Sequence, residues 1–131
     1  MTRREAREQA FILLFEKSFK NETDINEVIE LAKEQRNLEE NEFVLKLVHT
    51  AWENIEAIDD AIGSNARGWK INRIPKASLA IIRLALAEIL YCDDIPDGVS
   101  VNEAVELAKK YSTAEDASFI NGLLGTVVRS K

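Results

Sequence analysis

Three arginines near the start of the chain, Arg3, Arg4 and Arg7, are the residues best suited to bind an anion. Arg3 and Arg7 are four residues apart and share one face of a helix, whereas Arg4 lies about 100° away. Each guanidinium can hold a phosphate with two parallel hydrogen bonds or stack on an unpaired base. Positive charge at a helix N-terminus opposes the helix dipole, which favours a functional role for the cluster. A frayed, solvated terminus is the alternative.

A second basic group surrounds Trp69, which follows Arg67 and precedes Lys70 and Arg73. An aromatic ring among basic side chains can stack on a nucleobase while the basic side chains hold phosphate. Trp69 and Lys70 are therefore predicted RNA contacts. The ring can equally cover the core from a connector. Residues 61–87 contain five bases and no acid, whereas the net charge of the chain is −6. Such a distribution indicates local anion binding and not a general coating of nucleic acid.

Phe11, Phe15 and Phe19 recur every four residues and therefore lie along one line of a helix. The inward stripe of this helix is already supplied by smaller apolar residues, namely Ala6, Ala10, Leu13 and Leu14. We therefore expect part of the phenylalanine line to reach the surface, where it would suit a protein partner. Packing of these rings in the core is the alternative.

The sequence contains little that could support catalysis or hold a cofactor. His49 is the single histidine and has no second histidine or cysteine at the spacing of metal ligands. Cys92 is the single cysteine, and no glycine-rich phosphate loop is present. The chain is therefore not expected to be an enzyme or to hold a metal or cofactor. One cysteine and the absence of an apolar leader favour a cytoplasmic location.

Helix formers dominate the chain, which contains two prolines and five glycines. This composition and the apolar period predict an all-α fold of about seven helices in one domain spanning residues 1–131. The expected helices cover residues 3–19, a segment after Asp24, 39–62, 76–91, 101–111 and a segment after Ser112. Segment 76–91 is apolar on nearly all sides, which is typical of the buried centre of a domain.

Capping residues predict where the helices begin. Asp24 is a good N-cap for the second helix. Three pairs have the spacing of a capping box: Thr2 with Glu5, Ser100 with Glu103, and Ser112 with Glu115. Residues 63–75 form a basic connector with one helical turn. Because the breaks are short, neighbouring helices are expected to pack as bundles.

Longer motifs in a fixed order cover nearly the whole chain. They are Arg3–Glu8, Ile74–Lys76, Leu84–Leu90, Ile95–Pro96, Val101–Lys109 and Phe119–Leu124. On these motifs the sequence resembles the NusB family of bacterial transcription antitermination factors. The resemblance implies an all-helical fold of two small packed bundles.

The same resemblance implies a function in transcription. Members bind the boxA element of ribosomal RNA leader transcripts together with NusE, a small-subunit ribosomal protein. The complex joins the elongating RNA polymerase and other Nus factors and suppresses Rho-dependent termination. It thereby supports ribosomal RNA synthesis.

Particular residues receive roles from the resemblance. Arg3, Arg4 and Arg7 correspond to the arginine-rich RNA-binding segment of the family. Asp116 and Phe119 fall in its second RNA-contacting segment. The helix face that members turn toward NusE corresponds to Phe15 and Phe19, with Ser78 near the same surface.

Two other interpretations stay open at the level of sequence. A similar helical domain is fused to some ribosomal RNA cytosine methyltransferases, and on that basis the chain would be an RNA-binding accessory without catalysis. Alternatively, the chain is a protein-binding scaffold or a homodimer, in which the basic patches are only solvated surface. Neither interpretation involves a membrane.

Overall fold

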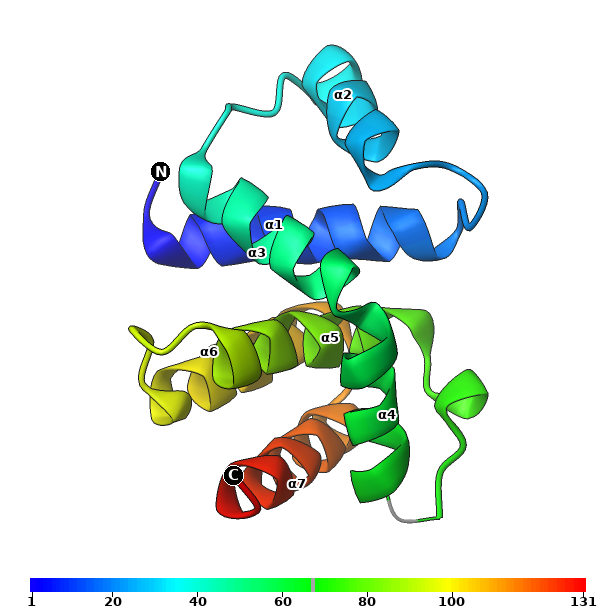
Figure 1. The fold of residues 1–131 in the computed structure, drawn as a ribbon, viewed down its shortest axis with the longest axis vertical. Helices are drawn as coiled ribbons and strands as arrows, with labels where there is room; N and C mark the ends of the chain where they lie inside the picture. Colours follow the sequence, from blue (N-terminus) through cyan, green and yellow to red (C-terminus); the bar gives the residue numbers. More distant parts are fainter. Residues whose placement is uncertain (67) are drawn as a thin grey trace.

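The computed structural model describes residues 1–66 and 68–131, so Arg67 of the basic connector lies outside the described residues. The described part contains seven α-helices, one 3-10 turn and no strand, which confirms the all-α prediction (Figure 1). The helices are α1 (Arg3–Ser18), α2 (Ile25–Arg36), α3 (Glu42–Glu53), α4 (Ile55–Asn65), α5 (Lys76–Tyr91), α6 (Asp97–Tyr111) and α7 (Ala114–Arg129), and the turn η1 is Ile71–Arg73. None of these helices is long and apolar enough to cross a membrane.

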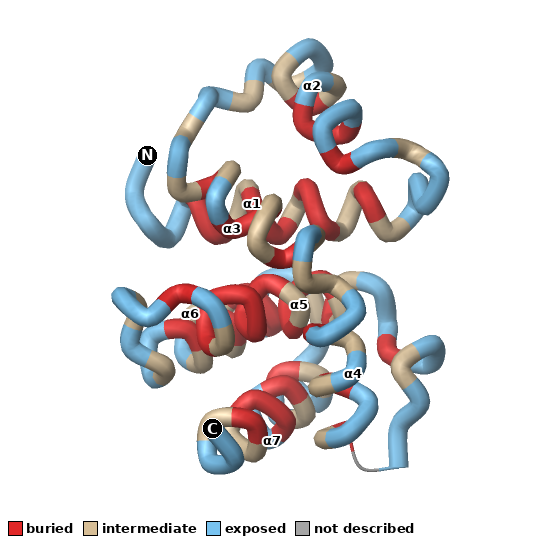
Figure 2. Tube along the Cα trace, viewed as in Figure 1, coloured by how far each residue is buried: buried red, intermediate tan, exposed pale blue. Residues whose placement is uncertain are grey.

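Helix α5 is the centre of the molecule. It contacts α1 and α3 on one side and α4, α6 and α7 on the other. Its buried residues extend from Ser78 to Ile89. In Figure 2 the trace of α5 is accordingly mostly red. The apolar pattern of segment 76–91 therefore predicted its position correctly, and the two packed helical bundles share this helix.

The prediction of a single long helix over residues 39–62 is wrong. The chain forms two helices there, α3 and α4, with a break at Asn54. The backbone of Asn54 leaves the helical region (φ −113°, ψ 21°), and its side-chain amide donates to the Thr50 carbonyl at 2.8 Å. Only one residue departs from the helix, so the apolar period continues across the break and hides it in the sequence. The change of direction lets α3 pack on α1 while α4 packs against α7.

Capping residues predicted two helix starts correctly. Thr2 and Glu5 form the full capping box of α1: the Thr2 hydroxyl accepts from the Glu5 N–H at 3.1 Å, and the Glu5 carboxylate accepts from the Thr2 N–H at 3.0 Å. Asp24 caps α2 by accepting from the Asn26 N–H at 2.8 Å. These contacts fix where the first two helices begin.

The predictions of capping boxes at Ser100 with Glu103 and at Ser112 with Glu115 are wrong. Helix α6 begins at Asp97, four residues earlier than expected, and Ser100 turns inward to donate to Glu88 at 2.9 Å. Helix α7 is capped by Thr113, whose hydroxyl accepts from the Asp116 N–H at 3.0 Å, and not by Ser112. In both places a buried or neighbouring carboxylate attracts the serine that the local pattern assigned to the cap.

Candidate nucleic-acid interface

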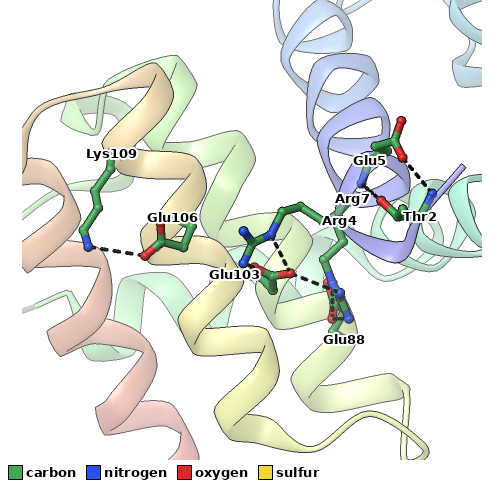
Figure 3. A network of polar contacts seen from close by, with 8 residues as sticks. All are labelled: Thr2, Arg4, Glu5, Arg7, Glu88, Glu103, Glu106 and Lys109. Carbon is green, nitrogen blue, oxygen red and sulfur yellow. Dashed lines mark hydrogen bonds and ion pairs between the residues drawn. The ribbon is translucent and has the colours of Figure 1, made fainter.

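Arg7 is not on the surface. Its side chain is only 7% exposed and points from α1 onto α5, where its Nε donates to the Glu88 carboxylate oxygens at 3.1 and 3.0 Å (Figure 3). The same carboxylate accepts from the Ser100 hydroxyl on α6. The buried pair therefore joins α1, α5 and α6, and it fixes the direction of the helix end that carries the other two arginines.

Arg4 lies on the surface beside α6, with 69% of its side chain exposed. Its guanidinium donates to the two oxygens of Glu103 at 2.9 and 3.3 Å (Figure 3). This hydrogen bond and the negative charge of Glu103 raise the pKa of Arg4 above its ordinary value. The outer edge of the guanidinium remains open to solvent, so Arg4 can still meet an anionic ligand.

Arg3 projects from α1 toward the start of α3. Its Cζ lies 3.8 Å from the ring centroid of Phe43, and within the described part of the chain it forms no ion pair. The cation–π contact supports the guanidinium from below and leaves its donors free. The predicted arginine cluster thus divides into two exposed cations and one buried positioning residue.

Two aromatic candidates from distant segments lie side by side. The ring centroids of Trp69 and Phe119 are 5.5 Å apart with an interplanar angle of 50°. Half of the Trp69 surface is exposed, and Phe119 is partly buried against the core. The pair offers a stacking surface at the start of α7, and the exposed Lys70 follows Trp69 in the chain.

Asp116 lies in the first turn of α7. Its carboxylate accepts a short hydrogen bond from the Ser112 hydroxyl, and the residue is partly buried. Ser112 also lies 3.3 Å from Ser78, which is almost fully buried. Ser78 is therefore buried beneath the surface near which the family resemblance placed it, because its hydroxyl joins α5 to the segment between α6 and α7.

The phenylalanine line of α1 runs from the core to the surface. Phe11 is buried against Tyr111 with centroids 4.8 Å apart, and Phe15 is half-buried. Phe19 is 61% exposed, stacks edge-on against Phe15 at 5.0 Å, and has Lys76 5.2 Å from its ring. Only the last ring is available as an anchor for a partner, so the two alternatives raised from the sequence each hold for part of the line.

Residues with catalytic potential are isolated. Across residues 1–66 and 68–131, no three metal-ligating side chains come together. His49 is half-buried on α3. Cys92 is buried, and burial raises the pKa of its thiol above the ordinary value.

The family model described as the NusB family matches residues 4–129. The chain belongs to the NusB family. A relative from Ruminiclostridium cellulolyticum, named transcription antitermination protein NusB, is 46% identical over 129 residues. The match covers 97% of this chain and 88% of the relative. The relative is named as an antitermination protein and not as an enzyme, in agreement with the sequence-based expectation.

Solved structures of the NusB family share the fold. The NusB chain of a crystal structure of antitermination factors NusB and NusE in complex with dsRNA superposes with a TM-score of 0.88 at 27% identity, covering 98% of this chain and 97% of that chain. T. maritima NusB also gives a TM-score of 0.88, at 29% identity over 98% of this chain and 92% of that one. The family assignment made from the motifs is therefore confirmed by both sequence and fold.

Proposed function

We propose that this chain is a transcription antitermination factor that binds boxA RNA of ribosomal RNA leader transcripts together with NusE. The observation that carries the proposal is the full-length match to the NusB chain of the complex described as NusB and NusE with dsRNA. The names of the relatives point to the same process. In this function the chain acts as one domain in the cytoplasm.

The mechanism is assembly, and no bond is made or broken. Arg3 and Arg4 hold phosphates at the start of α1, and the pair Trp69 and Phe119 stacks on unpaired bases. Phe19 anchors the protein partner on another surface. When this chain and NusE contact each other and bind the same transcript, the second RNA contact forms at high effective concentration. The assembly then joins RNA polymerase and other Nus factors, prevents Rho-dependent termination and sustains ribosomal RNA synthesis.

RNA selectivity tests this function. We expect the chain to bind a labelled boxA RNA more tightly than a scrambled RNA of the same composition, measured by fluorescence anisotropy. Affinity should fall steeply with salt, because each phosphate neutralised on a single strand adds about 0.7 to the log–log slope. Equal binding of the two RNAs, with NusE also present, would contradict the proposal and favour a protein-binding scaffold.

Replacing Phe19 with aspartate should weaken NusE binding by about tenfold or more, since an exposed aromatic anchor typically contributes more than 1 kcal/mol. Because Phe19 is largely exposed, the fold should tolerate the change. Isothermal titration with NusE gives the affinity. The matched control is Tyr91→Asp, which changes an exposed aromatic ring at the end of α5, and it should leave NusE binding unchanged. Equal affinities for the two variants would place the partner surface elsewhere.

A further inference from the structure

A groove of about 490 Å³ runs between α1 and α6. The two helices contact each other at Arg4 with Glu103, at Glu8 with Lys110, and at Phe11 with Tyr111. The contacts advance in the same direction along both helices. The groove therefore leads from the arginine end of α1 toward the last turn of α6.

Two lysines lie at the far end of this groove. The side chains of Lys109 and Lys110 are each 61% exposed. Lys109 pairs with Glu106 at 3.3 Å (Figure 3), and Lys110 pairs with Glu8 across the groove at 2.6 Å. The hydrogen bond from Lys110 to Glu8 raises the pKa of Lys110 above its ordinary value.

The lysines lie between the two predicted RNA-contacting regions. On one side the groove begins at Arg4. On the other side, Lys110 is two residues before Ser112, which donates to Asp116 at the start of α7. Phe119 is one helical turn further along α7 and packs against Trp69. The end of α6 therefore connects the groove to the region of Asp116 and Phe119 along the chain.

We propose that the groove between α1 and α6 carries the RNA backbone from Arg4 to the aromatic pair, with Lys109 and Lys110 as phosphate ligands. The proposal rests on the proposed function and adds a route and two ligands to it. In the free protein the basic side chains of the groove pair with carboxylates. Arg4 pairs with Glu103, and Lys110 pairs with Glu8. A phosphate replaces these carboxylates as the strand enters.

The balance of charge in the groove supports this exchange. Each exposed cation of the groove has an acidic partner: Arg4 with Glu103, Lys109 with Glu106, and Lys110 with Glu8. In the free protein these pairs neutralise the positive charge of the three cations. Exposed ion pairs contribute little net free energy, and a phosphate offers the same charge with more acceptor oxygens. The carboxylates thus keep the cations in place and compete with RNA for them.

The lysines are tested with the double variant Lys109→Gln/Lys110→Gln. We expect its affinity for boxA RNA to fall about tenfold, with a log–log salt slope lower by about 0.7 for each phosphate that is no longer neutralised. The control Lys20→Gln/Lys33→Gln removes the same charge from the α1–α2 region. Helical circular dichroism should be the same for both. Equal affinities for the two double variants would overturn the proposed path.

The competing carboxylate is tested with Glu103→Gln, which keeps the shape of the side chain and removes its charge. Release of Arg4 should tighten RNA binding about threefold. Glu40→Gln is the control, since Glu40 pairs with Lys33 away from the groove and carries the same charge. An equal gain in both variants, or weaker binding by Glu103→Gln, would contradict the exchange.

The proposed route and the proposed function fail in different ways. If the unmodified chain binds boxA RNA selectively but both groove variants match their controls, the function stands and the route is wrong. If the unmodified chain shows no selectivity with NusE present, the function itself is contradicted. The first titration therefore separates the two before any variant is interpreted.

Discussion

Replacement of Arg7 by alanine should lower the free energy of unfolding by about 3–5 kcal/mol. The loss is large because Glu88 would keep its charge in a buried position with only the Ser100 hydroxyl as a partner. Urea unfolding followed by circular dichroism measures the change. The sequence predicted Arg7 to be an RNA ligand. Because the side chain is buried, we expect its replacement to affect the stability of the protein most.

Two further variants test this interpretation of Arg7. Arg83→Ala breaks the more accessible pair with Asp59 and should destabilise the protein by only about 1 kcal/mol. The combined change Arg7→Met/Glu88→Leu replaces both charges by apolar groups and should recover most of the lost stability. If Arg7→Ala is no more destabilising than Arg83→Ala, the buried pair does not hold α1 on α5.

Removal of the two exposed arginines should have the largest effect on RNA binding. For Arg3→Ala/Arg4→Ala we expect at least about a tenfold loss of boxA affinity, because each guanidinium supplies charge-assisted hydrogen bonds to phosphate. The log–log salt slope should fall by about 1.4, at roughly 0.7 per phosphate. Anisotropy titrations at several salt concentrations give both quantities.

The controls for this variant separate position from total charge. Lys33→Ala/Arg129→Ala removes two positive charges from α2 and from the end of α7, and it should bind RNA nearly as the unmodified chain does. Arg3→Lys/Arg4→Lys keeps the charge but loses the planar fork, so it should recover only part of the affinity. RNA affinity of Arg3→Ala/Arg4→Ala equal to that of the remote control would show that the arginine end does not bind RNA.

Much of the fold could be predicted from local patterns. The apolar segment 76–91 indicated a central helix, and Thr2 with Glu5 indicated the start of α1, because both signals come from neighbouring residues. The break at Asn54 was hidden, since one residue that leaves the helix does not disturb an apolar period. Its cause is the different packing of α3 and α4, which no local pattern records.

The candidate site was predicted in part for the same reason. The arginines and the aromatic residues could be selected from their types, but their accessibility depends on contacts across the fold. Glu88 is the one acidic residue within the apolar helix α5. A lone acid in such a helix indicates a basic side chain buried beside it, which the structure shows to be Arg7. The contact between Trp69 and Phe119 joins segments fifty residues apart, and only the fold brings them together.

The affinity for boxA RNA, measured with and without NusE, is the most direct test of the proposed function. We expect selective, salt-sensitive binding of boxA by the chain alone, and a clearly higher affinity when NusE is present, because the two proteins share one RNA. A scrambled RNA should show neither the selectivity nor the gain. Binding that is equal for the two RNAs and unchanged by NusE would show that the chain does not act as a boxA-binding antitermination factor.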